Sequence, residues 1–162
     1  MQNIFLTPHF TLQELCASQT AEKHGIDNVP SEQEVENLRK LCEGCLEPLR
    51  EALGLPVVIT SGFRTKTLNA MLAHSSERSQ HMAGQAADFH VSGPNRRELL
   101  IKAFREILQN PKIDFDQLIL YPSFLHVSYV SKEKNRHGIL IGRRDGKLGY
   151  GRISLSNALK IN

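Results

Sequence analysis

The chain has 162 residues, which fits one domain with a sizeable core and no need for disulfide bonds. Apolar residues make up 40% of the chain and charged residues 23%, which excludes a disordered protein. No run of about 18 apolar residues is present, so no membrane-spanning helix is expected. The formal net charge is only +3 with both signs interspersed, which argues against a nucleic-acid partner.

The N-terminal segment has no basic start, continuous apolar stretch or small-residue cleavage site, so no signal peptide is visible. The three cysteines are Cys16, Cys42 and Cys45. An odd count does not suit a disulfide framework, and the pair Cys42-x-x-Cys45 lacks the second pair that a structural zinc site needs. We predict reduced, mostly buried cysteines.

The first third of the chain predicts helices. A short helix is expected within 7–24, where Thr11 can act as the N-cap. A longer amphipathic helix is expected from a cap at Ser31 to Gly54. Pro48 lies inside its apolar pattern, which predicts a kink or a split at that point.

The rest of the chain predicts short strands with two further helices. In chain order we expect a buried strand at 56–60, a short helix at about 66–73, a polar loop at 74–84, a strand at 85–91, a helix at about 94–109, a hairpin of strands at 115–121 and 124–130, and a ribbon at 137–153 that turns at Asp145-Gly146. This order predicts an α+β fold, with helices packed on a small antiparallel sheet. No linker divides the chain, so a single domain over 1–162 is expected.

Three polar residues occupy unusual positions. Asp88 lies in an apolar strand, and a buried carboxylate is costly unless it meets a cation or a metal ion. His81 precedes it in a glycine-containing loop, and His126 lies within the apolar strand FLHVSYV. Two imidazoles and a carboxylate suit tetrahedral Zn²⁺ and leave a fourth position for water, whose pKa then falls to near 7. The alternative is that loop amides bind Asp88 and that the histidines are unrelated.

Arg64 follows directly after a buried strand, where side chains at the end of a sheet often line a cleft. A guanidinium group at such a position can hold a substrate carboxylate bidentately or stabilise an oxyanion.

Several motifs in the chain together resemble those of a known family. The motifs SGFRT at 61–65, Asn69, SQHMAGQAAD at 79–88 and FDQLI…LHVS at 115–128 resemble peptidase family M15, the zinc D-Ala-D-Ala carboxypeptidases and related phage endolysins. The core motifs lie within 56–130.

The resemblance implies the hedgehog/DD-peptidase fold and Zn²⁺ held by His81, Asp88 and His126. It also implies that Arg64 faces the substrate or the tetrahedral intermediate, and that the substrates are peptidoglycan stem peptides.

One departure from the family concerns the general base. Many members carry a Glu three residues, or a His five residues, before the last zinc histidine, where this chain has Ser123 and Tyr121. If Pro122-Ser123 forms the hairpin turn, Tyr121 shares a face with His126. Tyr121 is then a candidate for orienting water or stabilising an oxyanion, but a phenol with a pKa near 10 is a poor base. The base itself is left unidentified.

Other motif residues have competing interpretations. Ser79 and Gln85 are candidate substrate-binding residues, against purely structural roles in the loop and at the start of the strand. His90 shares the predicted face of Asp88 and is a further candidate, against a packing role. Asp116 is expected to be structural.

The sequence therefore predicts a zinc-dependent peptidoglycan peptidase, of carboxypeptidase or endopeptidase type. It is expected to act as a monomer, either in the cytoplasm or delivered to the cell wall by a phage or prophage. The alternative is a non-catalytic, zinc-containing module that binds the cell wall or another partner.

Overall fold

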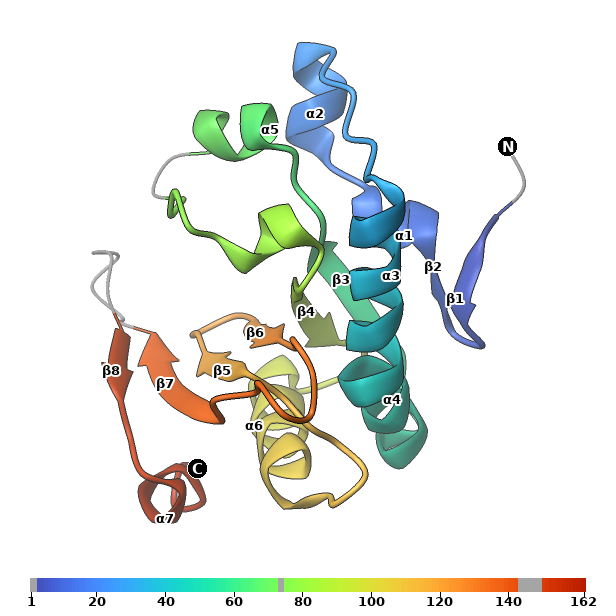
Figure 1. Ribbon diagram of the computed structural model, residues 1–162. Helices are drawn as coiled ribbons and strands as arrows, with labels where there is room; N and C mark the ends of the chain where they lie inside the picture. The colour runs from blue at the N-terminus through green and yellow to red at the C-terminus, as the bar shows by residue number, and fades with distance from the viewer. Residues whose placement is uncertain (1–2, 73–74, 143–149) are drawn as a thin grey trace.

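Within residues 3–72, 75–142 and 150–162, which the computed structural model describes, the chain forms a small hairpin, a six-stranded sheet and helices around it (Figure 1). The strands are β1 Phe5–Thr7, β2 Phe10–Thr11, β3 Val57–Ser61, β4 Ala86–Val91, β5 Gln117–Leu120, β6 Leu125–Ser128, β7 Gly138–Gly142 and β8 Tyr150–Arg152. The α-helices are α1 Leu12–Cys16, α2 Gln19–His24, α3 Glu32–Leu41, α4 Glu47–Leu53, α5 Lys66–Met71, α6 Arg96–Gln109 and α7 Leu155–Ala158.

The N-terminal helices begin where the capping residues predict. The Thr11 hydroxyl caps α1, and Ser31 forms a complete capping box with Glu34 at the start of α3. The single opening helix that was expected is instead two helices, α1 and α2, preceded by the hairpin β1–β2. The predicted split of the long helix is confirmed, because a π-helical segment at Cys42–Leu46 separates α3 from α4.

The six-stranded sheet has the order β3-β4-β6-β5-β7-β8, and among the strand pairs of the described residues only β5–β7 is parallel. In the predicted hairpin Ile119 lies opposite His126, and the backbone N–H of Tyr121 donates to the carbonyl of Phe124, so the expected register is confirmed. Strands β7 and β8 form the expected ribbon. Its predicted turn at Asp145-Gly146 lies outside the described residues.

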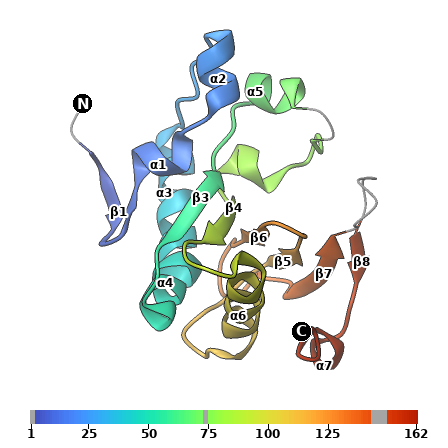
Figure 2. The ribbon, with the colours of Figure 1, turned by 180° about the vertical axis from the view of Figure 1, so that it is seen from behind.

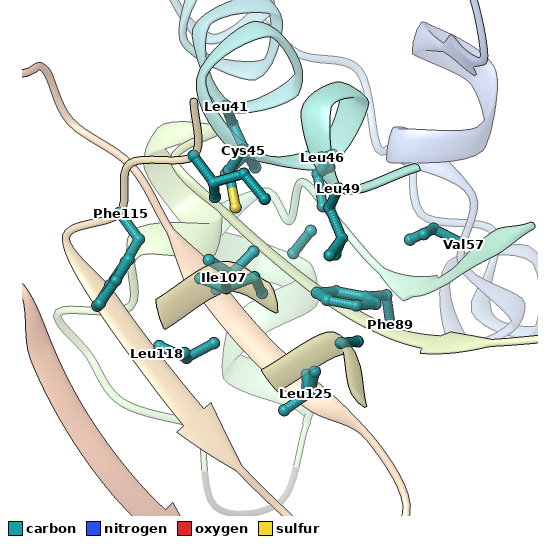
Figure 3. Close-up of a cluster of buried hydrophobic side chains, with 14 of the residues drawn as sticks. Leu41, Cys45, Leu46, Leu49, Val57, Phe89, Ile107, Phe115, Leu118 and Leu125 are labelled. Atoms are coloured by element: carbon teal, nitrogen blue, oxygen red, sulfur yellow. The ribbon is translucent and has the colours of Figure 1, made fainter. Parts of the chain in front are cut away.

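One face of the sheet carries the hydrophobic core. Phe89, Leu118 and Leu125 point from β4, β5 and β6 toward Leu49 of α4 and Ile107 of α6 (Figure 3). Seen from behind, α6 packs against the sheet at β4 and β5 (Figure 2). Because side chains alternate along a strand, Asp88 and His126 point to the opposite, open face. An α+β fold with helices packed on a mostly antiparallel sheet is therefore confirmed.

The cysteines are free, as predicted: Cys42 and Cys45 are fully buried in the core and Cys16 is partly buried. Burial raises the pKa of the Cys16 thiol to about 11, so it is protonated at neutral pH. Among the described helices, none has the length and apolar character needed to cross a membrane.

Candidate metal centre

His81, Asp88 and His126 converge on the open face of the sheet. Asp88 and His126 lie directly opposite each other on β4 and β6, and His81 comes from a 3₁₀ segment at Gln80–Ala83, where a loop was expected. One potential ligand atom from each residue lies within 4.8 Å of the other two. Asp88 Oδ1 is 2.8 Å from His126 Nδ1 and 3.4 Å from His81 Nε2.

The protonation state of His81 is fixed by its surroundings. Its Nδ1 lies 2.7 Å from the backbone carbonyl of Gly62, and a carbonyl only accepts, so Nδ1 carries the proton. Nε2 then offers its lone pair toward Asp88. Burial lowers the pKa of His81 and outweighs the opposing effect of Asp88, which keeps the imidazole neutral. A neutral histidine whose other nitrogen is anchored to a carbonyl is the usual metal-binding form.

Asp88 is held as a carboxylate. Burial opposes its ionisation, but its contacts with the side chains of His81 and His126 hold the pKa of Asp88 well below its usual range. Ligands about 2.0–2.2 Å from a tetrahedral zinc ion lie about 3.4 Å apart. The 3.4 Å separation between Asp88 Oδ1 and His81 Nε2 equals this value, whereas the 2.8 Å separation between Asp88 Oδ1 and His126 Nδ1 is a hydrogen bond that must lengthen by about 0.6 Å when both atoms bind one ion. Two imidazoles and a carboxylate are donors that suit such an ion.

Arg64 contacts the other oxygen of the same carboxylate. Its Nη2 lies 3.4 Å from Asp88 Oδ2, its Nε donates to Ser61 Oγ at 3.1 Å, and its Nη1 donates to Asn69 Oδ1 at 3.4 Å. A β-bulge after Ile59 brings Ser61 opposite Asp88 and so directs this end of the strand toward the centre. Ser61 and Asn69 therefore hold the arginine in place.

Two glycines allow the loops around the centre to pack closely. A Cβ on Gly62 would lie 2.1 Å from the carbonyl oxygen of Leu15, so no side chain fits there. Gly84 ends the 3₁₀ segment with a φ of +68°, and a Cβ there would lie 2.5 Å from the carbonyl oxygen of Glu34. The loop with the Gly62 carbonyl that binds His81, and the loop that follows His81, thus both depend on glycine.

A buried acid anchors the segment that carries His81, and the sequence did not reveal this contact. Asp116 is 1% exposed and accepts from Gln80 Nε2 at 2.9 Å and from the backbone N–H and Nε of Arg136 at 2.9 and 2.8 Å. The available signal was an acid among apolar residues in FDQLI. The expectation that Asp116 is structural agrees with this network.

Tyr121 lies at the end of β5, beyond Ile119, on the strand that pairs with His126. Its ring stacks on Phe124 with centroids 4.4 Å apart, and it occupies the space where a Cβ of Gly142 would lie. His90 faces the same side as Asp88, two residues along β4. The roles of Tyr121 and His90 at the centre stay predictions.

Ser79 and Gln85 contribute backbone hydrogen bonds to the loop. The carbonyl of Ser79 accepts from Met82, and Gln85 bonds to Gln80 and Tyr129 through its main chain. Ser79 lines a shallow pocket toward α3. Their roles as substrate-binding residues stay predictions.

An α+β domain with two histidines and an aspartate on the open face of its sheet has the arrangement of a metal-dependent hydrolase. The family model for peptidase M15 matches residues 8–128, about three quarters of the chain. The chain therefore belongs to the peptidase M15 family, whose members are zinc-dependent peptidases with the hedgehog/DD-peptidase fold. No curated protein matches it.

The match extends upstream of the core motifs at 56–130, to residue 8, and so includes the helices that support the sheet. Membership confirms the resemblance drawn from the motifs alone. It also makes a peptide the expected class of substrate.

Proposed function

We propose that the protein is a zinc-dependent peptidase that cleaves the stem peptides of peptidoglycan. The observation that carries the proposal is the convergence of His81, Asp88 and His126, with His81 Nε2 directed inward by the Gly62 carbonyl. We assign these three residues as the metal ligands. When bound, Zn²⁺ supplies Lewis acidity and lowers the pKa of a coordinated water.

The surrounding residues then have distinct proposed roles. Arg64 orients Asp88 through Oδ2, leaving Oδ1 for the metal side, and its remaining N–H groups stabilise negative charge on the substrate. Tyr121, which follows the strand that pairs with His126, is proposed to donate a hydrogen bond to the substrate. Ser79 and Gln85 are proposed substrate contacts at the loop edge.

The competing candidate is a non-catalytic, zinc-containing module that binds the cell wall or a partner. One observation favours it: the two positions that hold a Glu or His base in many relatives are Ser123 and Tyr121 here. Arg64 argues against it. The side chain of Arg64 is 13% exposed, and hydrogen bonds to Ser61 and Asn69 orient it toward the centre. A purely structural metal site does not need such an arginine.

The deciding experiment incubates purified peptidoglycan with the zinc-loaded protein, with the chelator-treated protein, and with the treated protein after zinc is restored. Mass spectrometry of the released fragments should show D-Ala or stem-peptide products in the first and third samples only. Binding to peptidoglycan without any zinc-dependent product would instead establish the module.

We further propose that residues 1–162 form one peptidase domain that acts as a monomer. The proposal retains both locations expected from the sequence, the cytoplasm or delivery to the wall in the manner of a phage or prophage endolysin. Size measurement in solution tests the monomer.

A further inference from the structure

A groove of about 810 Å³ opens beside the metal centre. It lies between α2, the end of β3, and Leu72 and Ser75 beyond α5. Helices α2 and α5 sit side by side at one end of the molecule in both views (Figures 1 and 2). Ser61 and Arg64 line the groove and also face Asp88. The groove is therefore continuous with the proposed centre, whereas a groove of about 460 Å³ along α6 lies on another part of the fold.

The lining of the groove suits a peptide. Ile59, Phe63 and Leu72 contribute apolar surface, while Thr20 and Thr60 contribute hydroxyl groups. Its volume falls within the range of about 300–1,000 Å³ that is typical of ligand pockets. Mixed apolar and hydrogen-bonding walls match the side chains and backbone of an extended peptide.

The position of Arg64 decides how far that peptide extends. In a carboxypeptidase site, an arginine that binds the terminal carboxylate marks the end of the space for substrate. Here the groove continues past Arg64. Three of the five N–H groups of the Arg64 guanidinium already face Ser61, Asn69 and Asp88. The negative charge of Asp88 also balances the positive charge of Arg64, and this weakens the attraction of Arg64 for a substrate carboxylate.

We propose that this groove binds the part of the substrate on the carboxyl-terminal side of the cleaved bond, so that the enzyme cuts internal peptide bonds. The inference rests on the proposed peptidase function and chooses between its two types. Substrate residues beyond the cleaved bond pass Arg64 and lie along β3 toward α2.

Glu22 gives the far part of this groove a charge preference. It lies on α2, is exposed, and has no ion-pair partner within 4.0 Å among the described residues. A cationic side chain on the substrate, such as a lysine ammonium, would pair with it. The groove therefore selects a basic residue in the segment that follows the cleaved bond.

The first test uses two synthetic peptides with the zinc-loaded full chain. One is a stem pentapeptide that ends in a free D-Ala-D-Ala, and the other is the same peptide extended by Gly-Lys and amidated at its end. We expect the extended peptide to be cut internally, with a kcat/KM at least equal to that of the free peptide. Release of terminal D-Ala from the free peptide, with no cutting of the extended one, would overturn the proposal.

The second test compares extensions of Gly-Lys and Gly-Gln in wild type and in Glu22→Gln. We expect the lysine peptide to have a KM lower by about 3- to 10-fold in wild type, and this difference to disappear in the variant. Glu51→Gln, the same change at an exposed site on α4 outside the groove, should preserve the preference. An equal preference in Glu22→Gln and wild type would remove Glu22 from the subsite.

Failure of the proposed function is distinguishable from failure of the groove. If the protein holds one zinc ion per chain and cuts neither peptide, the peptidase proposal fails. Calorimetric binding of the same peptides then decides the groove proposal. Tighter binding of the lysine-extended peptide that is lost in Glu22→Gln supports it, and equal binding of both peptides overturns it.

Discussion

The Nδ1 of His81 donates a 2.7 Å hydrogen bond to the backbone carbonyl of Gly62, nineteen residues earlier in the chain. This bond joins the SGFR turn to the loop that carries a proposed metal ligand. It directs Nε2 toward Asp88, and the same turn carries Arg64, which contacts the other oxygen of that carboxylate. The SGFRT and SQHMAGQAAD motifs are thus one structural unit around the centre.

The protein should bind one zinc ion per chain. His126→Ala removes one of three donors and should abolish most of the affinity, because two remaining ligands hold the ion poorly. Elemental analysis after dialysis, together with competition against a chelator, measures the effect. His24→Ala, at an exposed position on α2, is the control, and equal zinc content in His126→Ala and wild type would refute the ligand assignment.

Arg64→Ala should retain zinc and lower turnover by about 10²-fold, because it removes a charged group that stabilises the transition state. Steady-state kinetics and zinc analysis of the same preparation separate the two effects. Arg78→Ala, an exposed arginine in the neighbouring loop, should behave as wild type. Loss of zinc from Arg64→Ala would instead show that its contact with Asp88 is needed for metal binding.

Tyr121→Phe should lower kcat by about 10- to 100-fold, the cost of losing one hydrogen bond to a charged group. The substitution retains the ring that stacks on Phe124, so the variant should keep the wild-type fold. Kinetics and a melting curve are measured together. An unchanged rate would exclude the phenol from catalysis.

Asp116→Asn should weaken both stability and zinc binding. Burial opposes ionisation, yet hydrogen bonds from Arg136 and Gln80 lower the pKa of Asp116 to about 2, against about 3.9 in the unfolded chain. The ionised group therefore stabilises the fold fully above about pH 4, and this contribution is lost as the pH falls through about 2. The difference between variant and wild type, about 1–3 kcal/mol at neutral pH, should shrink below pH 4.

Zinc affinity should fall by about 10-fold in Asp116→Asn because Gln80, which precedes His81, loses its anchor. Asp114→Asn alters a neighbouring acid that bonds to Asn135 and His137 instead, and should leave the affinity unchanged. Equal zinc affinity in both variants would limit Asp116 to a purely structural role.

Local pattern in the sequence was enough to predict the class of fold and the set of candidate ligands. Capping at Ser31, the split near Pro48 and the register that sets Ile119 opposite His126 all depend on neighbours in the chain. The ligand candidates followed from an acid in an apolar strand, since burial of a charge demands a partner.

Only the tertiary structure decided how these residues are held. The bond between His81 and Gly62, the contact of Arg64 with Asp88 and the anchoring of Gln80 by Asp116 each join segments 19 to 36 residues apart. The groove beside β3 likewise depends on how α2 and α5 pack around the end of the sheet. Spacing along the chain encodes periodicity and local capping, but such long-range contacts arise only when separate elements pack together.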